Sequence, residues 1–274
     1  MARKFSLVHL TYIGWTPAEM IYNASLVGFD CVSPRTICQG LPGERNYDIT
    51  GNNDLYKATK QALADTGITI NDIELAKIDS GTMDVNVYEP HLEAAASLGV
   101  NNVITNIWTS DSGFYIEKFG DLCDLAAQYG MTVNLEFVTW AKVPSLQDAR
   151  KVIDSVRKPN SAILLDTLHF HRSRVTLNEL KDYPSDLFRI AHLCDASIEI
   201  PTNEEALIHT GRRERLYPGD GGIDIAAIVK NLSKDVVFGI EVPNFEYIDR
   251  IGATEHARRC LIRTKEYLKK NSLE

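Results

Sequence analysis

The 274-residue chain lacks the features that mark disulfide-stapled, zinc-finger and membrane-spanning proteins. No stretch approaches the roughly 20 apolar residues of a membrane span, and the first residues lack the apolar core of a signal peptide. Five cysteines lie far apart, without a CxxC pair: Cys31, Cys38, Cys123, Cys194 and Cys260. We therefore expect reduced thiols and a cytoplasmic protein with no membrane partner.

The chain also has fewer basic than acidic residues. The chain has 29 Lys and Arg against 37 Asp and Glu, which gives a formal net charge of −8 at pH 7. An acidic protein repels phosphate backbones, so the balance argues against nucleic acid as a partner and favours a small-molecule site. With 44% hydrophobic and 24% charged residues, the composition is otherwise that of a globular protein.

Short apolar runs alternate with longer segments of helical spacing along the whole chain. Eight strand-like runs each precede a helix-like run, which is the pattern of βα units around a parallel sheet. The predicted strands span residues 5–10, 29–33, 68–75, 100–107, 131–138, 162–168, 188–194 and 236–242. The predicted helices span residues 17–27, 55–66, 87–98, 114–129, 145–156, 177–183, 223–232 and 253–270. A long polar loop is expected between the seventh strand and the helix that follows it.

Eight such units without a linker-like change in composition predict one closed (β/α)8 TIM barrel, a single α/β domain over residues 1–274. The alternative is a doubly wound open sheet. It is disfavoured because the first βα turn carries no glycine fingerprint for a dinucleotide, and no GxxxxGK[ST] motif occurs. Since TIM barrels carry their catalytic groups at the carboxyl ends of the strands, we expect the site there.

The last four predicted strands end in ionisable residues that an apolar strand pattern does not explain: Glu136, Asp166, His192 and Glu241. Three carboxylates cannot crowd together at neutral pH without a counter-charge, because their repulsion would force protonation of at least one. A divalent cation supplies that charge, and oxygen-rich ligation with one imidazole suits Mn²⁺, with Mg²⁺, Co²⁺ or Zn²⁺ as alternatives. Otherwise each residue would form a salt bridge or cap a loop separately.

Further candidates surround this cluster. His169, three residues after Asp166, lies where it could relay protons, and Arg215 could clamp a carboxylate, phosphate or enolate oxygen of a substrate. The alternative for Arg215 is a solvated charge run. Four further candidates for substrate binding have packing or surface roles as alternatives: Arg35, Asn106, Trp108 and His171.

At these residues the sequence resembles the sugar phosphate isomerase/epimerase superfamily, the xylose isomerase-like TIM barrels that include endonuclease IV-type enzymes. The resemblance covers essentially the whole chain, and its most specific stretches are residues 134–137, 165–169, 192–196, 215–221 and 239–241. It implies that one divalent metal ion, often manganese, is bound by Glu136, Asp166, His192 and Glu241. The third and fourth strand ends lack the histidines of the endonuclease branch, which disfavours DNA repair.

The resemblance also implies an enzyme, a metal-dependent isomerase or epimerase of a ketose or related keto-polyol, phosphorylated or not. Its chemistry is proton abstraction next to a carbonyl with a metal-stabilised enediolate, and its catalytic residues are Glu136, Glu241 and His169. A lyase of the 3-dehydroshikimate or inosose dehydratase type is the alternative, since one metal site serves both outcomes. A polyol-binding barrel without chemistry is a third possibility, and a homo-oligomer is left open.

Overall fold

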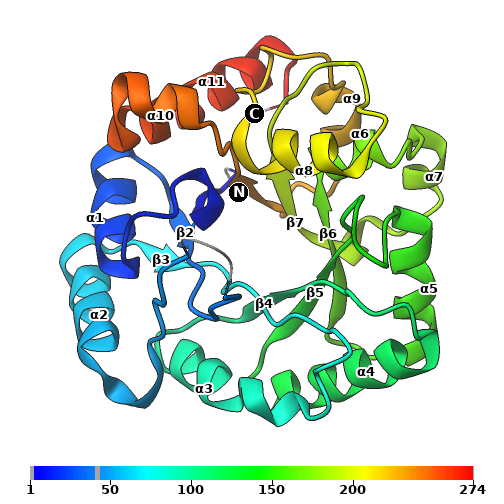
Figure 1. The fold of residues 1–274 in the computed structure, drawn as a ribbon. Coiled ribbons are helices and arrows are strands. Elements are labelled where there is room, and N and C mark those ends of the chain that lie inside the picture. Colours follow the sequence, from blue (N-terminus) through cyan, green and yellow to red (C-terminus); the bar gives the residue numbers. More distant parts are fainter. Residues whose placement is uncertain (1–2, 41–43, 274) are drawn as a thin grey trace.

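The computed structural model describes residues 3–40 and 44–273. Eight parallel strands form one sheet in the order β3-β2-β1-β8-β7-β6-β5-β4. Parallel bridges between Ile73 and Val103 and between Ile78 and Ile107 join its two ends. The strands therefore form a ring that helices surround (Figure 1), the (β/α)8 barrel that the sequence predicts.

The elements follow the predicted alternation. The strands are β1 (Phe5–Val8), β2 (Cys31–Ser33), β3 (Thr69–Ile70), β4 (Asn102–Thr105), β5 (Thr132–Glu136), β6 (Ser161–Asp166), β7 (Phe188–Leu193) and β8 (Val237–Ile240). The α-helices are α1 (Pro17–Val27), α2 (Asp54–Thr66), α3 (Glu89–Ser97), α4 (Ser112–Gln128), α5 (Leu146–Val156), α6 (Thr167–Arg172), α7 (Leu177–Lys181), α8 (Glu204–Arg213), α9 (Ile225–Val229), α10 (Phe245–Ile251) and α11 (Ala253–Lys270). Short 3₁₀ helices are η1 (His9–Thr11), η2 (Thr50–Asn52), η3 (Val85–Tyr88) and η4 (Ser185–Leu187).

Local signals in the sequence set the ends of the helices. The Thr16 side chain accepts a hydrogen bond from the backbone N–H of Glu19, and Pro17 occupies the first position of α1. Gly28 ends that helix in the left-handed conformation, with φ 97°, which a residue with a side chain adopts only at a cost. The boundaries of α1 are therefore those that the sequence predicts.

Two differences from the predicted elements lie at the carboxyl ends of strands. The strand expected over residues 162–168 ends at Asp166, because the Asp166 side chain accepts the backbone N–H groups of Leu168 and His169 and so begins α6. The polar loop expected after residue 194 contains a helix, α8, whose N-cap is Asn203. Both differences change how side chains are presented to the open end of the barrel.

The third strand and the segment after β8 also differ from the prediction. The third strand, expected over residues 68–75, has only the two residues of β3, and beyond them the chain pairs with its neighbours through isolated bridges. After β8 the chain forms an additional helix, α10, for which the Asn244 side chain provides the N-terminal cap. Each of these segments borders the carboxyl end of the barrel.

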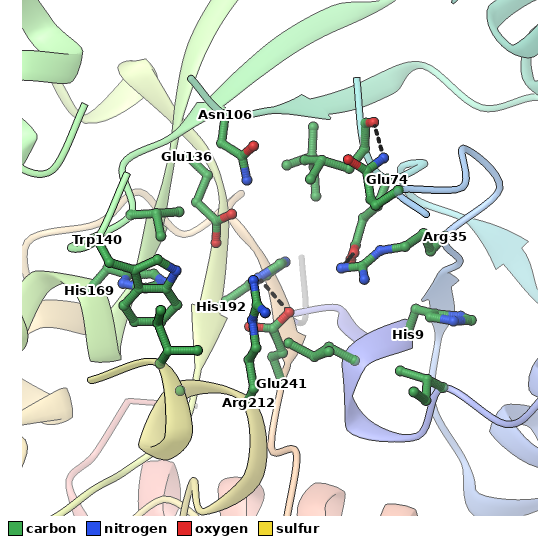
Figure 2. Close-up of a pocket in the computed structure, with 18 of the residues that line it drawn as sticks. His9, Arg35, Glu74, Asn106, Glu136, Trp140, His169, His192, Arg212 and Glu241 are labelled. Carbon is green, nitrogen blue, oxygen red and sulfur yellow. Dashed lines mark hydrogen bonds and ion pairs between the residues drawn. The ribbon is translucent and has the colours of Figure 1, made fainter. Parts of the chain in front are cut away.

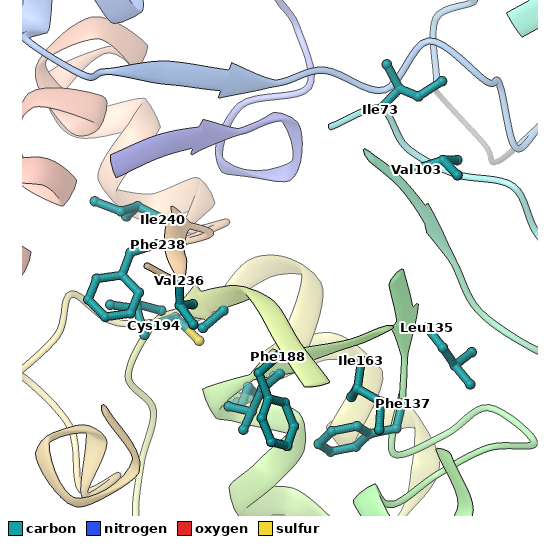
Figure 3. Packing of buried hydrophobic residues seen from close by; sticks show 14 of the residues in the cluster. Ile73, Val103, Leu135, Phe137, Ile163, Phe188, Cys194, Val236, Phe238 and Ile240 are labelled. Carbon is teal, nitrogen blue, oxygen red and sulfur yellow. The ribbon is translucent and has the colours of Figure 1, made fainter. Parts of the chain in front are cut away.

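Buried side chains fill both faces of the strands. Figure 3 shows members of the larger apolar cluster, which include Leu135 of β5, Ile163 of β6 and Phe238 of β8. A separate small cluster consists of Leu75, Ile104, Leu164 and Ile190. Because side chains alternate along a strand, Leu164 and Ile190 share a face with Asp166 and His192, two residues further on. This small cluster therefore forms an apolar floor for the strand ends.

Among residues 3–40 and 44–273, no helix has the length and apolar character that crossing a membrane requires.

Thiol accessibility tests the packing of the barrel. Four cysteines are buried and Cys38 is exposed. Burial raises the pKa of the Cys31, Cys123 and Cys194 thiols to about 12 and raises that of Cys260 as well. Since the thiolate is the reactive form, we expect the thiol reagent DTNB to modify one cysteine in the native protein and all five after unfolding. Cys38→Ser should abolish the native reaction, and several fast thiols in the wild type would contradict this packing.

Candidate active site

Glu136, Asp166, His192 and Glu241 meet at the carboxyl end of the barrel. Each offers one ligand atom, and the four atoms lie within 4.8 Å of one another. Asp166 and His192 are register partners at the ends of β6 and β7, Glu136 ends β5, and Glu241 directly follows β8. The structure therefore brings together the four residues that the sequence singled out.

The donor set fits a divalent cation. Bonds from such a metal to oxygen or nitrogen are roughly 2.0–2.2 Å long, so two ligands of one ion lie at most about 4.4 Å apart. The observed cluster needs only a small contraction to meet that limit. Both ring nitrogens of His192 are buried without a hydrogen-bond partner among the described residues, and Nδ1 lies 3.7 Å from Oε1 of Glu241. A buried imidazole without a hydrogen bond is costly, and coordination of a metal would satisfy one of its nitrogens.

The charges of the cluster shift one another's pKa values. Burial, followed by repulsion from Glu241, raises the pKa of Glu136 to about 8. Burial would lower the pKa of His192, but Glu241 and the other carboxylates outweigh it and raise the value to about 10. Burial would raise the pKa of Glu241, but Arg215 and His192 hold it well below its usual range. Of the two glutamates, Glu136 therefore takes up a proton more readily than Glu241.

Arg215 supplies a positive charge inside the cluster. Its Nη1 donates a hydrogen bond to Oδ2 of Asp166 at 2.6 Å and lies 2.8 Å from Oε2 of Glu241. Its Nε donates to the backbone oxygen of Gly211 at 2.7 Å, and its side chain is only 2% exposed. The expected contact between Arg215 and a substrate anion stays a prediction. In the structure the guanidinium is the charge partner of two candidate metal ligands.

A cavity of about 620 Å³ lies above the cluster. Figure 2 shows the labelled side chains around it, with Arg35 and Glu74 on one side and Trp140 and His169 on the other. Three of the four clustered residues line the cavity, namely Glu136, His192 and Glu241. The other sequence candidates in its wall are Arg35, Asn106, Trp108, His169 and Arg215. Nε1 of Trp108 donates to Oδ1 of Asn106 at 2.6 Å, which fixes both side chains after β4.

His169 is held as a neutral hydrogen-bond donor. Its Nδ1 accepts a hydrogen bond from the backbone N–H of Thr139 at 3.2 Å. Because a backbone N–H can only donate, the proton of the neutral ring is on Nε2. Burial lowers the pKa of His169 to about 4, and the Trp140 ring contacts it edge-on with 4.8 Å between the ring centroids. Its protein contacts therefore leave His169 a donor, not a base, at neutral pH.

His171 does not reach the cavity, so its expected role in substrate binding is not supported. Two residues along a helix correspond to a rotation of roughly 200°, which places His171 on the opposite face of α6 from His169. There its Nδ1 accepts from Nη1 of Arg172 at 2.8 Å. The structure thus gives His171 a side-chain partner outside the cavity wall.

Sequence reasoning missed part of the cavity wall. Glu74 lines the cavity, and its Oε2 accepts a hydrogen bond from Nη2 of Arg35 at 2.9 Å. Its other carboxylate oxygen is buried without a hydrogen-bond partner among the described residues, and burial raises the pKa of Glu74 to about 7. The alternation of Asp72 and Glu74 with apolar neighbours in the third predicted strand could have indicated an acidic inner face. Other missed wall residues include His9, Trp140 and Arg212.

A closed eight-stranded barrel with three carboxylates and one histidine at adjacent strand ends defines a class of metal-binding TIM barrels. The sequence model of one protein family, described as xylose isomerase-like TIM barrel, matches residues 21–264. The chain belongs to this family, as the sequence resemblance predicts.

Proteins to which the chain is similar include a named isomerase and a named epimerase. The chain is 24% identical over 176 residues to an inosose isomerase of Bacillus subtilis (strain 168), a match that spans 60% of this chain and 61% of that protein. In structure it is similar to the IolI protein with a bound zinc atom, with a TM-score of 0.81, 19% identity and coverage of 98% and 99% of the two chains. It is also similar to the 3-keto-D-glucoside 4-epimerase YcjR of E. coli, with a TM-score of 0.72, 17% identity and coverage of 96% and 99%. At these identities the structural likeness shows the fold alone.

Gly239 of β8 tests how tightly His192 is held. A Cβ atom at this position would lie 2.5 Å from Cδ2 and 3.0 Å from Nε2 of His192. Gly239→Ala must therefore displace the imidazole, and we expect a stability cost of about 1–3 kcal/mol and loss of most of the metal-induced rise in Tm. The matched control is Gly120→Ala, whose Cβ would lie 3.6 Å from Val156 and should not change the metal response. Calorimetry with and without Mn²⁺ measures both, and a full metal response in Gly239→Ala would contradict the geometry.

Arg215→Gln tests the internal counter-charge. The variant leaves Asp166 and Glu241 buried without their guanidinium partner, and we expect a loss of about 3–5 kcal/mol in urea unfolding with chelator present. Mn²⁺ should restore more stability to the variant than it adds to the wild type, because it supplies the missing positive charge. Arg258→Gln removes the same charge from the surface of α11 and should change stability by less than about 0.5 kcal/mol. If Arg215→Gln lost the same free energy of unfolding with and without Mn²⁺, Arg215 would not be the counter-charge of the cluster.

Proposed function

We propose that the protein is a divalent-metal-dependent isomerase or epimerase that acts on a ketose or a related keto-polyol. The observation that carries the proposal is the convergence of three carboxylates and one imidazole at the base of a cavity of about 620 Å³. The similarity to an inosose isomerase supports a keto-polyol substrate, and the zinc in a structural neighbour supports a metal. We propose Mn²⁺ because the ligands are mostly oxygen, with Mg²⁺, Co²⁺ or Zn²⁺ as alternatives.

The residues that would hold the metal are Glu136, Asp166, His192 and Glu241. A cation bound there supplies Lewis-acid polarisation of the substrate carbonyl, which acidifies the neighbouring C–H group. The orientation of Asp166 is fixed by its own contacts, because Oδ1 accepts two backbone N–H groups and Oδ2 accepts from Arg215. We assign Asp166 and His192 to metal binding alone.

The two glutamates are the acid and base candidates, and their surroundings differ. Arg215 holds Glu241, whereas the Glu136 side chain forms no hydrogen bond or ion pair with the residues that the structure describes. Glu136 in its ionised form is therefore the group we propose to take the proton from the substrate carbon, since a cation in the cluster would offset the repulsion that raises its pKa. Return of the proton to the adjacent carbon gives an isomer, and return to the opposite face of the same carbon gives an epimer. Epimerisation needs a second proton, delivered to the opposite face. Glu241 is the candidate for delivering it, and because Arg215 and His192 keep it ionised, it must first take up a proton from solvent.

A dehydratase is the second candidate, and His169 is the observation that favours it. The N–H at Nε2 could donate to a hydroxyl that leaves after the same proton abstraction. A neutral imidazole is, however, a much weaker acid than an imidazolium, and burial keeps His169 neutral. We therefore place isomerisation or epimerisation first, with His169 as a hydrogen-bond donor to a substrate oxygen.

Solvent isotope exchange tests the proposal. In D₂O with Mn²⁺, the protein should introduce deuterium next to the carbonyl of at least one compound in a panel of inososes, ketoses and 3-dehydroshikimate. Mass spectrometry follows the label, and chelator should abolish its uptake. Glu136→Gln should slow exchange by at least about 100-fold because the base is lost, whereas Glu266→Gln on the outer helix α11 should match the wild type.

The products separate the candidate activities. Deuterium uptake without loss of water supports the isomerase or epimerase, whereas loss of water with new enone or aromatic absorbance supports the dehydratase. Binding of a polyol without exchange in the wild type would reject both and leave a binding protein.

A further inference from the structure

Two hydrogen-bond donors in the cavity wall lack a protein partner in the part of the chain that the structure describes. Nε1 of Trp140 is buried and unpaired. Arg212, in the last turn of α8, is half-buried, and its guanidinium forms neither a hydrogen bond nor an ion pair with residues 3–40 and 44–273. Figure 2 shows Arg212 extending from α8 toward the centre of the cavity. Unpaired donors at this depth point to a ligand, since the fold itself does not satisfy them.

The other cations of the cavity wall are already engaged. Their partners are Glu74 for Arg35, Asp79 for Lys77, the Phe245 ring for Arg213, and both Asp166 and Glu241 for Arg215. Arg212 differs from them, because among the described residues it has neither a carboxylate partner nor an aromatic ring partner. Burial and the positive charge of Arg35 both lower the pKa of Arg212. Arg35 and Arg212 thus face the same space, and within residues 3–40 and 44–273 only Arg35 of the two has an acidic partner.

The favourable interaction of a cation with the C-terminal end of a helix does not explain why the Arg212 side chain is half-buried in the cavity wall. Cations are favoured in the last turn of a helix, and both Arg212 and Arg213 benefit from that position. Arg213 is exposed, as a residue placed for this reason alone would be, whereas Arg212 lies half-buried in the cavity. The nearest acid on its own helix face is Glu205, about 10 Å away along the axis of α8. Neither the helix terminus nor an acid on α8 therefore explains why the Arg212 side chain points into the cavity.

The end of α8 is held in place over the cluster. A Cβ atom at Gly211 would lie 2.4 Å from Cη2 of Trp140, so the glycine allows the indole to pack directly on the helix backbone. The Gly211 carbonyl also accepts the hydrogen bond from Nε of Arg215. The same turn of helix thus contacts Trp140, positions Arg212 and connects to the charge partner of the candidate metal ligands.

We infer that the substrate carries an oxyanion substituent, a carboxylate or a phosphate, which Arg212 and the indole N–H of Trp140 bind while its carbonyl group faces the carboxylate and histidine cluster. The placement of the carbonyl rests on the proposed function, and the anion site rests on the unpaired donors. A guanidinium binds either oxyanion through two parallel N–H groups, and Arg35 adds a second positive charge across the cavity. The hydroxyls of a neutral polyol can accept hydrogen bonds from Arg212 and Trp140 but do not offset the charge of Arg212, so the site favours an oxyanion.

Matched ketoses test the anion site. The probes are fructose, fructuronate and fructose 6-phosphate, which share the ketose and differ by a hydroxyl, carboxylate or phosphate at one end. Calorimetric titration of the Mn²⁺-loaded protein should show one charged sugar binding about 10- to 100-fold more tightly than fructose. The charged sugar that binds more tightly than fructose shows whether the site takes a carboxylate or a phosphate. Arg212→Gln should remove this preference, Arg212→Lys should restore part of it, and Arg258→Gln on the outer surface should keep it.

Inorganic phosphate and malonate, titrated into the metal-free protein, separate the anion site from the metal. One of them should bind saturably to the wild type and at least about 10-fold more weakly to Arg212→Gln. Equal affinity for charged and neutral sugars, or binding that does not depend on Arg212, would overturn the inference, as would the absence of binding in both titrations.

The two proposals fail in different ways. If no carbonyl compound exchanges with D₂O but phosphate or malonate binding depends on Arg212, the proposed function is wrong and the anion site stands. If neutral and charged ketoses exchange equally well and Arg212→Gln behaves like the wild type, the function stands and the anion site is wrong.

Discussion

Repulsion between carboxylates at adjacent strand ends is the constraint on which the site depends. Two like charges about 4 Å apart repel by about 4 kcal/mol at the effective dielectric near a protein surface, and the barrel brings three acids together. That energy is a large fraction of the stability of an ordinary domain, so counter-charges are required. His192 and Arg215 provide them in the metal-free protein, and a divalent cation would provide them more completely.

The segment between β7 and α9 joins this electrostatic requirement to substrate recognition. Arg215 returns from the end of α8 to Asp166 and Glu241, and its Nε holds the carbonyl of Gly211 one residue before Arg212. The segment that neutralises the cluster thus also shapes the cavity above it (Figures 1 and 2). Changes in this segment would alter specificity without moving the strand ends that carry the acids.

One site of this kind can support different outcomes because the first chemical step is shared. Proton removal next to a carbonyl requires the cluster, and the fate of the resulting species depends on the donors in the wall. His169 illustrates the point, since a single backbone N–H from Thr139 decides which of its nitrogens carries a proton. An isomerase then differs from a dehydratase in which group acts next. In the isomerase a group returns a proton to carbon, and in the dehydratase a donor assists the leaving hydroxyl.

The barrel and its four clustered residues could be predicted from the sequence, because both depend on local and periodic signals. Helix α11 spans the residues expected for it, and parallel strands place their carboxyl ends at one face. The helix inside the long loop, α8, was missed because a polar composition conceals its single capping residue, Asn203. The short β3 was overestimated because its apolar run continues beyond its ladder pairing.

The sequence by itself determined that acids and a histidine would meet at one end of a barrel. Only the tertiary structure decided which cations neutralise them. Arg212 and Arg215 belong to the same basic run, yet Arg215 is buried between two carboxylates while Arg212 faces the cavity. The partner of Arg215, Asp166, lies 49 positions away, so the pairing depends on the path of an irregular segment that no local pattern encodes. Periodicity specifies which face a residue occupies, whereas charge pairing across the barrel depends on the packed three-dimensional arrangement.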